Sequence, residues 1–219
     1  MPTAAVILAD GHGPGPAMVL PRPLLPVGDR AILDVVLAQL RDAGVAEVLI
    51  TGGRHASLLR TVVGDGSAHG LRIRYQPDGP LAGLTDTFLM MHGDAYTDLD
   101  YGHLIAAHRQ AGNALTIATT EREVPTEFGV VGGEGRSVTG YETRPPVRCR
   151  ADMGVYAVEP SALAGAAADG PALAQALLAR GERVGAYEHG GFWFDLGRPE
   201  DFDAAQLHVA SGATRRRAA

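Results

Sequence analysis

Two aspartates are the residues of this sequence best suited to chemistry. Asp94 ends the segment Phe88-Leu-Met-Met-His-Gly-Asp94, and Asp195 ends the segment Phe192-Trp-Phe-Asp195. Each follows a short apolar run typical of a buried strand, and side chains at strand ends line the clefts of α/β proteins. Carboxylate oxygens are hard ligands, so two aspartates brought together at such a cleft could share one divalent metal ion.

A turn rich in glycine and proline, Ala9-Asp-Gly-His-Gly-Pro-Gly-Pro16, comes directly after the strand-like run Ala4–Leu8. Glycine lets the main chain approach a ligand closely, so N–H groups of such a turn can surround phosphate oxygens. A phosphate-binding turn together with a metal site indicates a nucleotide. Simpler alternatives stay open: the turn could be a connector, Asp195 a helix cap and Asp94 an ordinary turn residue.

The length and charge of the chain set its class. Its 219 residues are 46% hydrophobic and 20% charged, which suits one sizeable α/β domain. We expect a single domain over residues 1–210 and a disordered tail over residues 211–219, which include Arg215-Arg-Arg217. The net charge of −6 argues against a nucleic-acid partner.

The apolar runs and the cysteine content point to a compartment. No apolar run reaches the length of a membrane span, so no membrane partner is expected. Cys149 is the single cysteine, which excludes an internal disulfide and favours a reducing cytoplasm.

Strand-like and helix-like segments alternate in the first half of the chain. We expect strands at Ala4–Leu8, Glu47–Thr51, Arg72–Tyr75, Thr87–Met91 and Ala114–Thr119, with helices at Ala31–Ala43, Ala56–Val63 and Tyr101–Gln110. This alternation predicts a mostly parallel sheet with helices on both faces. The second half predicts strands at Glu127–Val131, Val138–Glu142, Asp152–Val158, Val184–Glu188 and Phe192–Asp195, a helix within Pro171–Arg180 and a closing helix from Pro199.

Seven segments resemble, in order, those of the sugar-1-phosphate nucleotidylyltransferases. They are Ala5-Val-Ile-Leu-Ala9 with the glycine turn, Pro21-Arg-Pro-Leu-Leu-Pro-Val-Gly28, His92-Gly-Asp94, Glu127-Phe-Gly-Val-Val131, Tyr141-Glu-Thr-Arg-Pro145, Met153-Gly-Val-Tyr156 and Phe192-Trp-Phe-Asp-Leu-Gly-Arg-Pro-Glu-Asp-Phe202. The chain is most similar to short, single-domain members such as the heptose-1-phosphate guanylyltransferases and the N-acetylmuramate-1-phosphate uridylyltransferases. The resemblance implies a Rossmann-like nucleotidyltransferase fold, with a mixed, mostly parallel central sheet flanked by helices.

The same resemblance implies an activity and assigns residues to it. The family transfers a nucleoside monophosphate from a nucleoside triphosphate to a sugar 1-phosphate, using Mg²⁺ and releasing pyrophosphate. By position, Arg22 and Asp94 would be catalytic, and Asp94 and Asp195 would bind the metal. The nucleotide would contact Leu8, Ala9, Gly11, Gly13, Arg22, Gln76, Ala82, Gly83 and Gly93. The sugar phosphate would contact Gly129, Glu142, Arg144, Asp152 and Gly154.

The sequence also departs from the family pattern. The phosphate turn lacks the family's arginine and is about three residues short, while Arg22 and Arg144 stand where the family has lysines. Arginine keeps the charge but binds phosphate in a bidentate way, through two hydrogen bonds. One alternative is therefore an impaired relative that binds nucleotide or sugar phosphate, or regulates an active partner. An acceptor other than a sugar phosphate is another. The base, the sugar and the oligomeric state stay open, and a homo-oligomer is among the partners considered.

Overall fold

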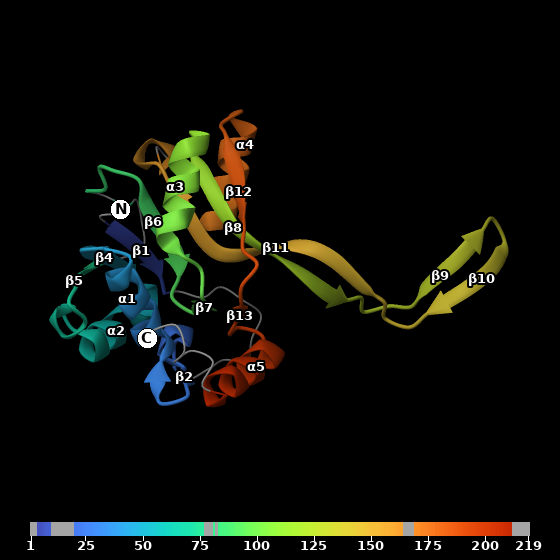
Figure 1. Cartoon of the computed structure of the whole chain (residues 1–219), viewed down its shortest axis with the longest axis horizontal. Helices are drawn as coiled ribbons and strands as arrows, with labels where there is room; N and C mark the ends of the chain where they lie inside the picture. The colour runs from blue at the N-terminus through green and yellow to red at the C-terminus, as the bar shows by residue number, and fades with distance from the viewer. Residues whose placement is uncertain (1–3, 10–19, 77–80, 82, 164–168, 212–219) are drawn as a thin grey trace.

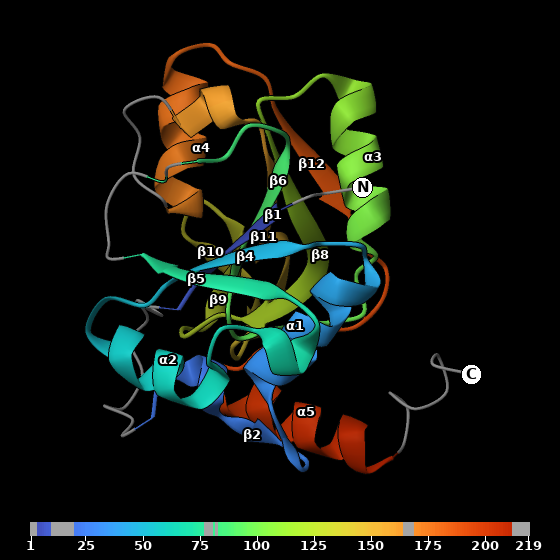
Figure 2. The ribbon, with the colours of Figure 1, turned by 90° about the vertical axis from the view of Figure 1, so that its left-hand side faces the viewer.

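The computed structural model describes residues 4–9, 20–76, 81, 83–163 and 169–211, and a seven-stranded sheet forms its centre (Figures 1 and 2). The strand order is β12-β8-β11-β6-β1-β4-β5. These strands are β1 (Ala4–Leu8), β4 (Glu47–Thr51), β5 (Arg72–Gln76), β6 (Phe88–His92), β8 (Leu115–Pro125), β11 (Pro146–Val158) and β12 (Val184–Glu188).

Most neighbours in this sheet run parallel. β1 pairs in parallel with β4 and β6, β4 with β5, and β8 with β12. β11 is antiparallel to both of its neighbours, β6 and β8. The mixed, mostly parallel sheet expected from the sequence is confirmed.

Helices cover both faces of the sheet, as the alternating pattern predicts. On one face, α1 (Ile32–Asp42), α2 (Ala56–Val63), α3 (Tyr101–Ala111) and α5 (Pro199–Ala210) contribute to the larger apolar core. On the other face, α4 (Gly170–Ala179) packs on a second core through Leu173 and Leu177. Neighbouring residues of β1 divide between the two cores, since Ile7 faces the first and Val6 the second.

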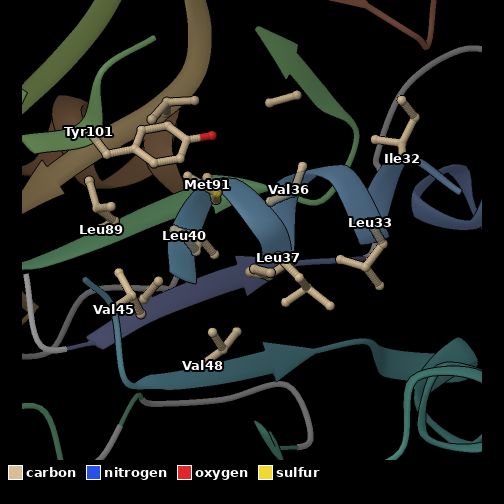
Figure 3. Close-up of a cluster of buried hydrophobic side chains, with 14 of the residues drawn as sticks. Ile32, Leu33, Val36, Leu37, Leu40, Val45, Val48, Leu89, Met91 and Tyr101 are labelled. Atoms are coloured by element: carbon tan, nitrogen blue, oxygen red, sulfur yellow. The ribbon is translucent and has the colours of Figure 1, made fainter. Parts of the chain in front are cut away.

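Helix α1 shows how the sequence pattern becomes packing. Its apolar residues recur at helical spacing and form one stripe. The stripe is fully buried and faces side chains of the sheet and of α3 (Figure 3). The residues of this contact are Ile32, Leu33, Val36, Leu37 and Leu40 from the helix, with Val45, Val48, Leu89, Met91 and Tyr101 opposite.

Short elements complete the body beside the sheet. β7 (Ala95–Thr97) pairs antiparallel with β13 (Trp193–Asp195), and β2 (Pro26–Val27) pairs with β3 (Arg30–Ala31). The described residues also include the short 3₁₀ turns η1 (Arg22–Leu24), η2 (Gly53–His55), η3 (Ser67–His69) and η4 (Pro160–Leu163). Among all these short elements, η1 and the β7–β13 pair position the charged residues discussed below.

A long hairpin extends out of the sheet, and we call residues 120–151 the arm. Beyond the body, β8 and β11 pair only with each other, from Thr120 opposite Ala151 to Pro125 opposite Pro146. The tip of the arm is a second pair, β9 (Val130–Glu134) with β10 (Ser137–Glu142). Figure 1 shows the arm projecting from the body, with no other described element beside its outer part.

The arm is where the expected boundaries were wrong. β8 continues past the expected end at Thr119, and β11 begins six residues before the expected Asp152. The strand expected at Glu127–Val131 lies three residues later, and β7 was not expected at all. The predicted single domain stays a prediction, and the predicted tail lies, except for its first residue, outside the described residues. Among the described residues, no helix is both long and apolar enough to span a membrane.

Candidate functional site

The candidate site lies at the carboxyl end of β1, where the sheet changes its direction of growth. β4 and β5 continue on one side of β1, whereas the next strand along the chain in this sheet, β6, lies on the other. The last residues of these strands form a row, because Leu8 pairs with Thr51 and His92, and Thr51 pairs with Gln76. Ligands of open α/β sheets bind at such switch points.

Asp94 lies directly after β6 at this switch point. It is only 8% exposed, and this burial is the main cause that raises the pKa of its carboxyl group. His92 and Arg22 act in the opposite direction, and the nearby Asp195 raises the pKa further. A buried carboxylate beside a second one is poorly stabilised as an anion, so a cation at this point would be bound favourably.

Asp195 comes to the same place through strand pairing. Within the β7–β13 ladder it lies opposite Ala95, the residue after Asp94. Its Oδ1 accepts a hydrogen bond from the Gly197 N–H at 3.0 Å. Helix α5 begins with Arg198 at its N-cap and has no side-chain cap, so Asp195 shapes the turn before the helix and does not cap it. The two aspartates therefore lie near each other, as the sequence predicts, and a metal ion shared by them stays a prediction.

Arg22 supplies a positive charge to this pair. It opens η1, and its Nη1 lies 3.8 Å from Asp94 Oδ2. A Cβ atom on Gly197 would lie 2.5 Å from Arg22 Nη1 and 3.1 Å from Asp195 Oδ1, so the guanidinium and the second carboxylate share the space beside this glycine. Gly93 has a similar spatial role, because a Cβ there would lie 2.8 Å from Pro23 Cγ in η1.

Two further charged residues support the site, and the sequence reasoning missed them. Asp201 on α5 accepts the N–H of Asp195 at 2.8 Å and two hydrogen bonds from Arg122 of β8, at 2.7 and 2.5 Å. The guanidinium of Arg122 also stacks over Trp193, 5.0 Å from the ring centre. Asp201 lies within the Phe192–Phe202 segment, which could have drawn attention to it. No sequence signal points to Arg122.

The charged groups fit a divalent metal that takes only part of its shell from protein. Among the residues that the structure describes, no group of three or more His, Cys, Asp or Glu side chains could hold a metal ion. Two carboxylates are what a magnesium ion uses when phosphate oxygens and water complete its octahedron. The unfavourable burial of Asp94 beside Asp195 agrees with such a cation.

The residues expected to contact the nucleotide lie partly at this edge. Leu8 and Gln76 belong to the row of strand ends, and Ala9 follows Leu8 with its N–H bonded to the Thr51 carbonyl at 2.8 Å. Gly93 is buried beside Asp94, and Gly83 is exposed with a positive φ of 80°. Gly11, Gly13 and Ala82 lie outside the described residues. Nucleotide contact stays a prediction for all of these positions.

The residues expected to contact a sugar phosphate fall into two groups. Gly154 lies near the site, because a Cβ there would be 2.8 Å from His92 Nδ1. The Asp152 carboxylate accepts hydrogen bonds from the Gly154 N–H and the Tyr156 hydroxyl, at 2.8 and 2.7 Å.

The other three residues belong to the arm: Gly129 precedes β9, Glu142 ends β10 and Arg144 follows it. The structure does not bring β9 and β10 to the aspartates (Figure 1). The role of all five residues in sugar-phosphate binding stays a prediction.

The arginines at lysine positions follow the composition of the whole chain. The sequence contains no lysine, so arginine accounts for all 19 of its basic residues. Arginine at positions 22 and 144 therefore does not by itself indicate an altered reaction. Its charge is permanent, whereas a buried lysine can lose its proton.

The sheet order defines a doubly wound α/β protein with charged groups at its switch point. The profile of the family described as nucleotidyl transferase matches residues 4–212. The chain therefore belongs to the nucleotidyl transferase family, which confirms the expected family.

Individual relatives agree with this assignment. The chain is 28% identical to the mannose-1-phosphate guanylyltransferase of Mycobacterium tuberculosis, over 95% of this chain and 65% of that protein. It is 26% identical to a low-salt glycan biosynthesis nucleotidyltransferase of Haloferax volcanii, over 90% of this chain and 62% of that protein. The chain thus spans about three-fifths of these relatives. The crystal structure of HddC from Yersinia pseudotuberculosis has the same fold, with a TM-score of 0.72, 17% identity, and 94% and 99% of the two chains covered.

Proposed function

We propose that this chain transfers a nucleoside monophosphate from a nucleoside triphosphate to a sugar 1-phosphate and releases pyrophosphate. The observation that carries the proposal is the meeting of Arg22, Asp94 and Asp195 at the switch point of the sheet. Two curated relatives support it, one named for guanylyl transfer to mannose 1-phosphate and one as a nucleotidyltransferase of glycan biosynthesis.

The reaction requires positioning and charge neutralisation more than covalent chemistry. An oxygen of the sugar phosphate attacks the α-phosphorus, and the bond to pyrophosphate breaks on the opposite side. Negative charge gathers on the oxygens around the α-phosphorus, so a fixed cation lowers the barrier. The position of Arg22 supports this role, because its guanidinium lies beside both aspartates and can donate to a phosphate oxygen.

Asp94 and Asp195 would hold Mg²⁺ against the phosphates. When bound, the ion would neutralise phosphate charge and orient the triphosphate for in-line attack. Asp94 is fixed by its burial and by the packing of Gly93, and Asp195 by its hydrogen bonds to Gly197 and Asp201. Both carboxylates are thus held in place before the ligand arrives, which limits the entropy lost on binding.

A pyrophosphate-release screen tests the proposal. The purified chain is mixed with Mg²⁺, each common nucleoside triphosphate and a panel of sugar 1-phosphates. We expect release only when a triphosphate and a sugar 1-phosphate are both present, and loss of release in Asp94→Asn and Asp195→Asn. Asp42→Asn is a matched control, since Asp42 is 67% exposed at the end of α1.

The screen can also reject the proposal. If no pair of substrates releases pyrophosphate, thermal shifts with the same ligands ask whether the chain only binds them. Binding without turnover would favour the impaired relative instead.

The cytoplasmic location expected from the lone Cys149 stays a prediction.

A further inference from the structure

The arm holds more of the exposed large apolar side chains than the rest of the described residues. Eleven large apolar side chains are exposed among all the described residues. Six of them belong to the arm, with exposures from 42% to 68%. They are Phe128, Val130, Val131, Val138, Tyr141 and Val147. Monomeric proteins rarely leave a continuous apolar surface in water, and an isolated two-stranded ribbon has little stability of its own. The arm therefore has the features of an interaction surface.

Three apolar side chains of the arm tip share one face, while Val130 lies on the opposite face with Glu142. Val131 pairs with Tyr141, and Gly133 with Val138. Because a bulge between Val138 and Gly140 restores the alternation, Val131, Val138 and Tyr141 share a face. A Cβ on Gly129 would collide with the Tyr141 hydroxyl, so the ring end of Tyr141 rests over this glycine. The tip thus presents an aromatic ring with little freedom to lose on binding.

The base of the arm has one charged face and one face that carries an apolar pair. Glu123 pairs with Arg148 and Glu121 with Arg150, which forms a charged ladder on one face. The other face carries Val124 opposite Val147, and next to them Arg122 opposite Cys149, with Arg122 bonded to Asp201 of the body. At the outer end of this segment, Pro125 lies opposite Pro146, and neither can donate an N–H to an added strand. At this point of the arm a partner would therefore pack on a face of the ribbon and would not extend it edge to edge.

The charge distribution indicates which partner fits. Residues 120–151 contain five glutamates and five arginines and no other charged residue, so the whole net charge of −6 lies on the rest of the chain. A nucleic acid or an anionic membrane would require a basic arm. A strongly charged protein partner would gain no electrostatic attraction from an arm of zero net charge. Two copies of this chain repel each other least through their arms.

The area of the arm also suits self-association. Residues 120–135 span up to about 50 Å at roughly 3.3 Å per residue, and a two-stranded ribbon is about 10 Å wide. One face thus measures roughly 500 Å², and two faces together reach the roughly 1,000 Å² expected of a weak but specific interface. We infer that the arm is a homodimer interface, in which the apolar faces of two arms pack around a two-fold axis.

Sedimentation velocity over a concentration series tests this inference without using activity. We expect a reversible species of twice the 22.8 kDa chain mass. The double variant Val131→Ser/Tyr141→Ser should raise the dissociation constant at least about tenfold, because it removes an aromatic anchor and its neighbour. Val62→Ser is the matched control, since Val62 on α2 is 57% exposed, as is Val131. Circular dichroism melting checks that each variant is folded.

The single cysteine allows a second, direct measurement. Cys149 is exposed and lies on β11 within the arm, so a nitroxide attached to it gives one spin per chain. Any dipolar distance in pulsed electron resonance is then between two copies. We expect a defined distance distribution that disappears in the double variant and persists in Val62→Ser. A monomer at every concentration would overturn the inference and assign the arm to another partner. A dimer insensitive to the double variant, or equally weakened by Val62→Ser, would also overturn it.

Discussion

Arg122 and Asp201 form a bidentate ion pair that links the base of the arm to the candidate metal site. Nη1 and Nη2 of Arg122 donate to the two carboxylate oxygens of Asp201, which also accepts the N–H of Asp195. Burial alone would raise the pKa of Asp201, but the hydrogen bonds from Arg122 and from the Asp195 backbone hold it below its usual range. Asp201 therefore stays ionised and fixes the backbone at Asp195.

Replacing Asp201 with Asn should affect both stability and metal binding. Arg122 would lose a charged partner within a partly buried contact, and we expect the free energy of unfolding to fall by about 2–3 kcal/mol. One acceptor oxygen of residue 201 would be lost, so Arg122 and the N–H of Asp195 would share the single oxygen of Asn and Asp195 would be held less firmly. The Mg²⁺-dependent affinity for a triphosphate should therefore fall too. Urea unfolding and calorimetric titration measure the two effects.

The control for Asp201→Asn is a second arginine of the arm. Arg148 donates to Glu123 at 2.8 Å, but its side chain is 81% exposed. Water and salt screen exposed ion pairs, so Arg148→Gln should change stability little and leave metal binding intact. Equal losses in the two variants would contradict the positioning role of Asp201.

Arg22 should be the cation on which turnover depends. Arg22→Ala should reduce the rate of pyrophosphate release by roughly one to three powers of ten, as expected when a partner of transition-state charge is lost. Arg22→Lys should restore part of the rate, because the charge returns without the fork. Steady-state kinetics of the three proteins give the comparison. An active chain indifferent to Arg22→Ala would show that the triphosphate lies elsewhere.

A methyl group at Gly197 should displace Arg22 without unfolding the protein. The added Cβ would lie 2.5 Å from Arg22 Nη1, the end of a flexible side chain that can move aside. We expect Gly197→Ala to keep its melting temperature within a few degrees and to lose a large part of the turnover that depends on Arg22.

Gly190→Ala is the control for Gly197→Ala, since a Cβ there meets no atom within 4 Å. The two substitutions carry the same backbone change from glycine to alanine. Normal turnover in both variants would mean that the observed position of Arg22 is not the catalytic one.

The sequence predicts the sheet and the two aspartates well because their signals are local. Buried strands such as β1 and β6 are continuous apolar runs, and Asp94 follows one of them immediately. The parallel sheet brings Asp94 to the edge where its strands end, whereas Asp195 comes there through the pairing of β13 with β7. The alternation of strands and helices then leaves few arrangements for the order of the elements.

The sequence does not predict the arm or the support of Asp195, because both depend on contacts between distant segments. Residues 120–125 read as a polar connection, and only their pairing with residues 146–151 makes them a strand. Arg122 and Asp201 are 79 residues apart, and no periodicity links them. The contact of Glu142 and Arg144 with a sugar phosphate is expected from the order of the motifs alone. The order of motifs gives no information on how far a hairpin extends from the body of the protein.

His108 should make stability depend on pH below neutrality. It is fully buried on α3, with Nδ1 2.9 Å from the Thr116 hydroxyl and Nε2 3.1 Å from a carboxylate oxygen of Glu159. Burial is the main cause that lowers the pKa of His108 below 6.5, and Arg109 acts in the same direction, although Glu159 opposes both.

The sign of the effect follows from proton binding. As the pH decreases below about 6.5, the unfolded chain binds a proton on this histidine, whereas the folded chain binds it only at a lower pH. The free energy of unfolding therefore decreases as the pH decreases. The stabilisation is complete above the unfolded pKa and is lost as the pH falls toward the folded pKa. Urea unfolding at about pH 7.5 and about pH 5.5 should show a larger loss for the wild type than for His108→Gln. His103→Gln, on the exposed side of the same helix, should behave like the wild type. Equal losses in the wild type and His108→Gln would show that His108 is not the group responsible.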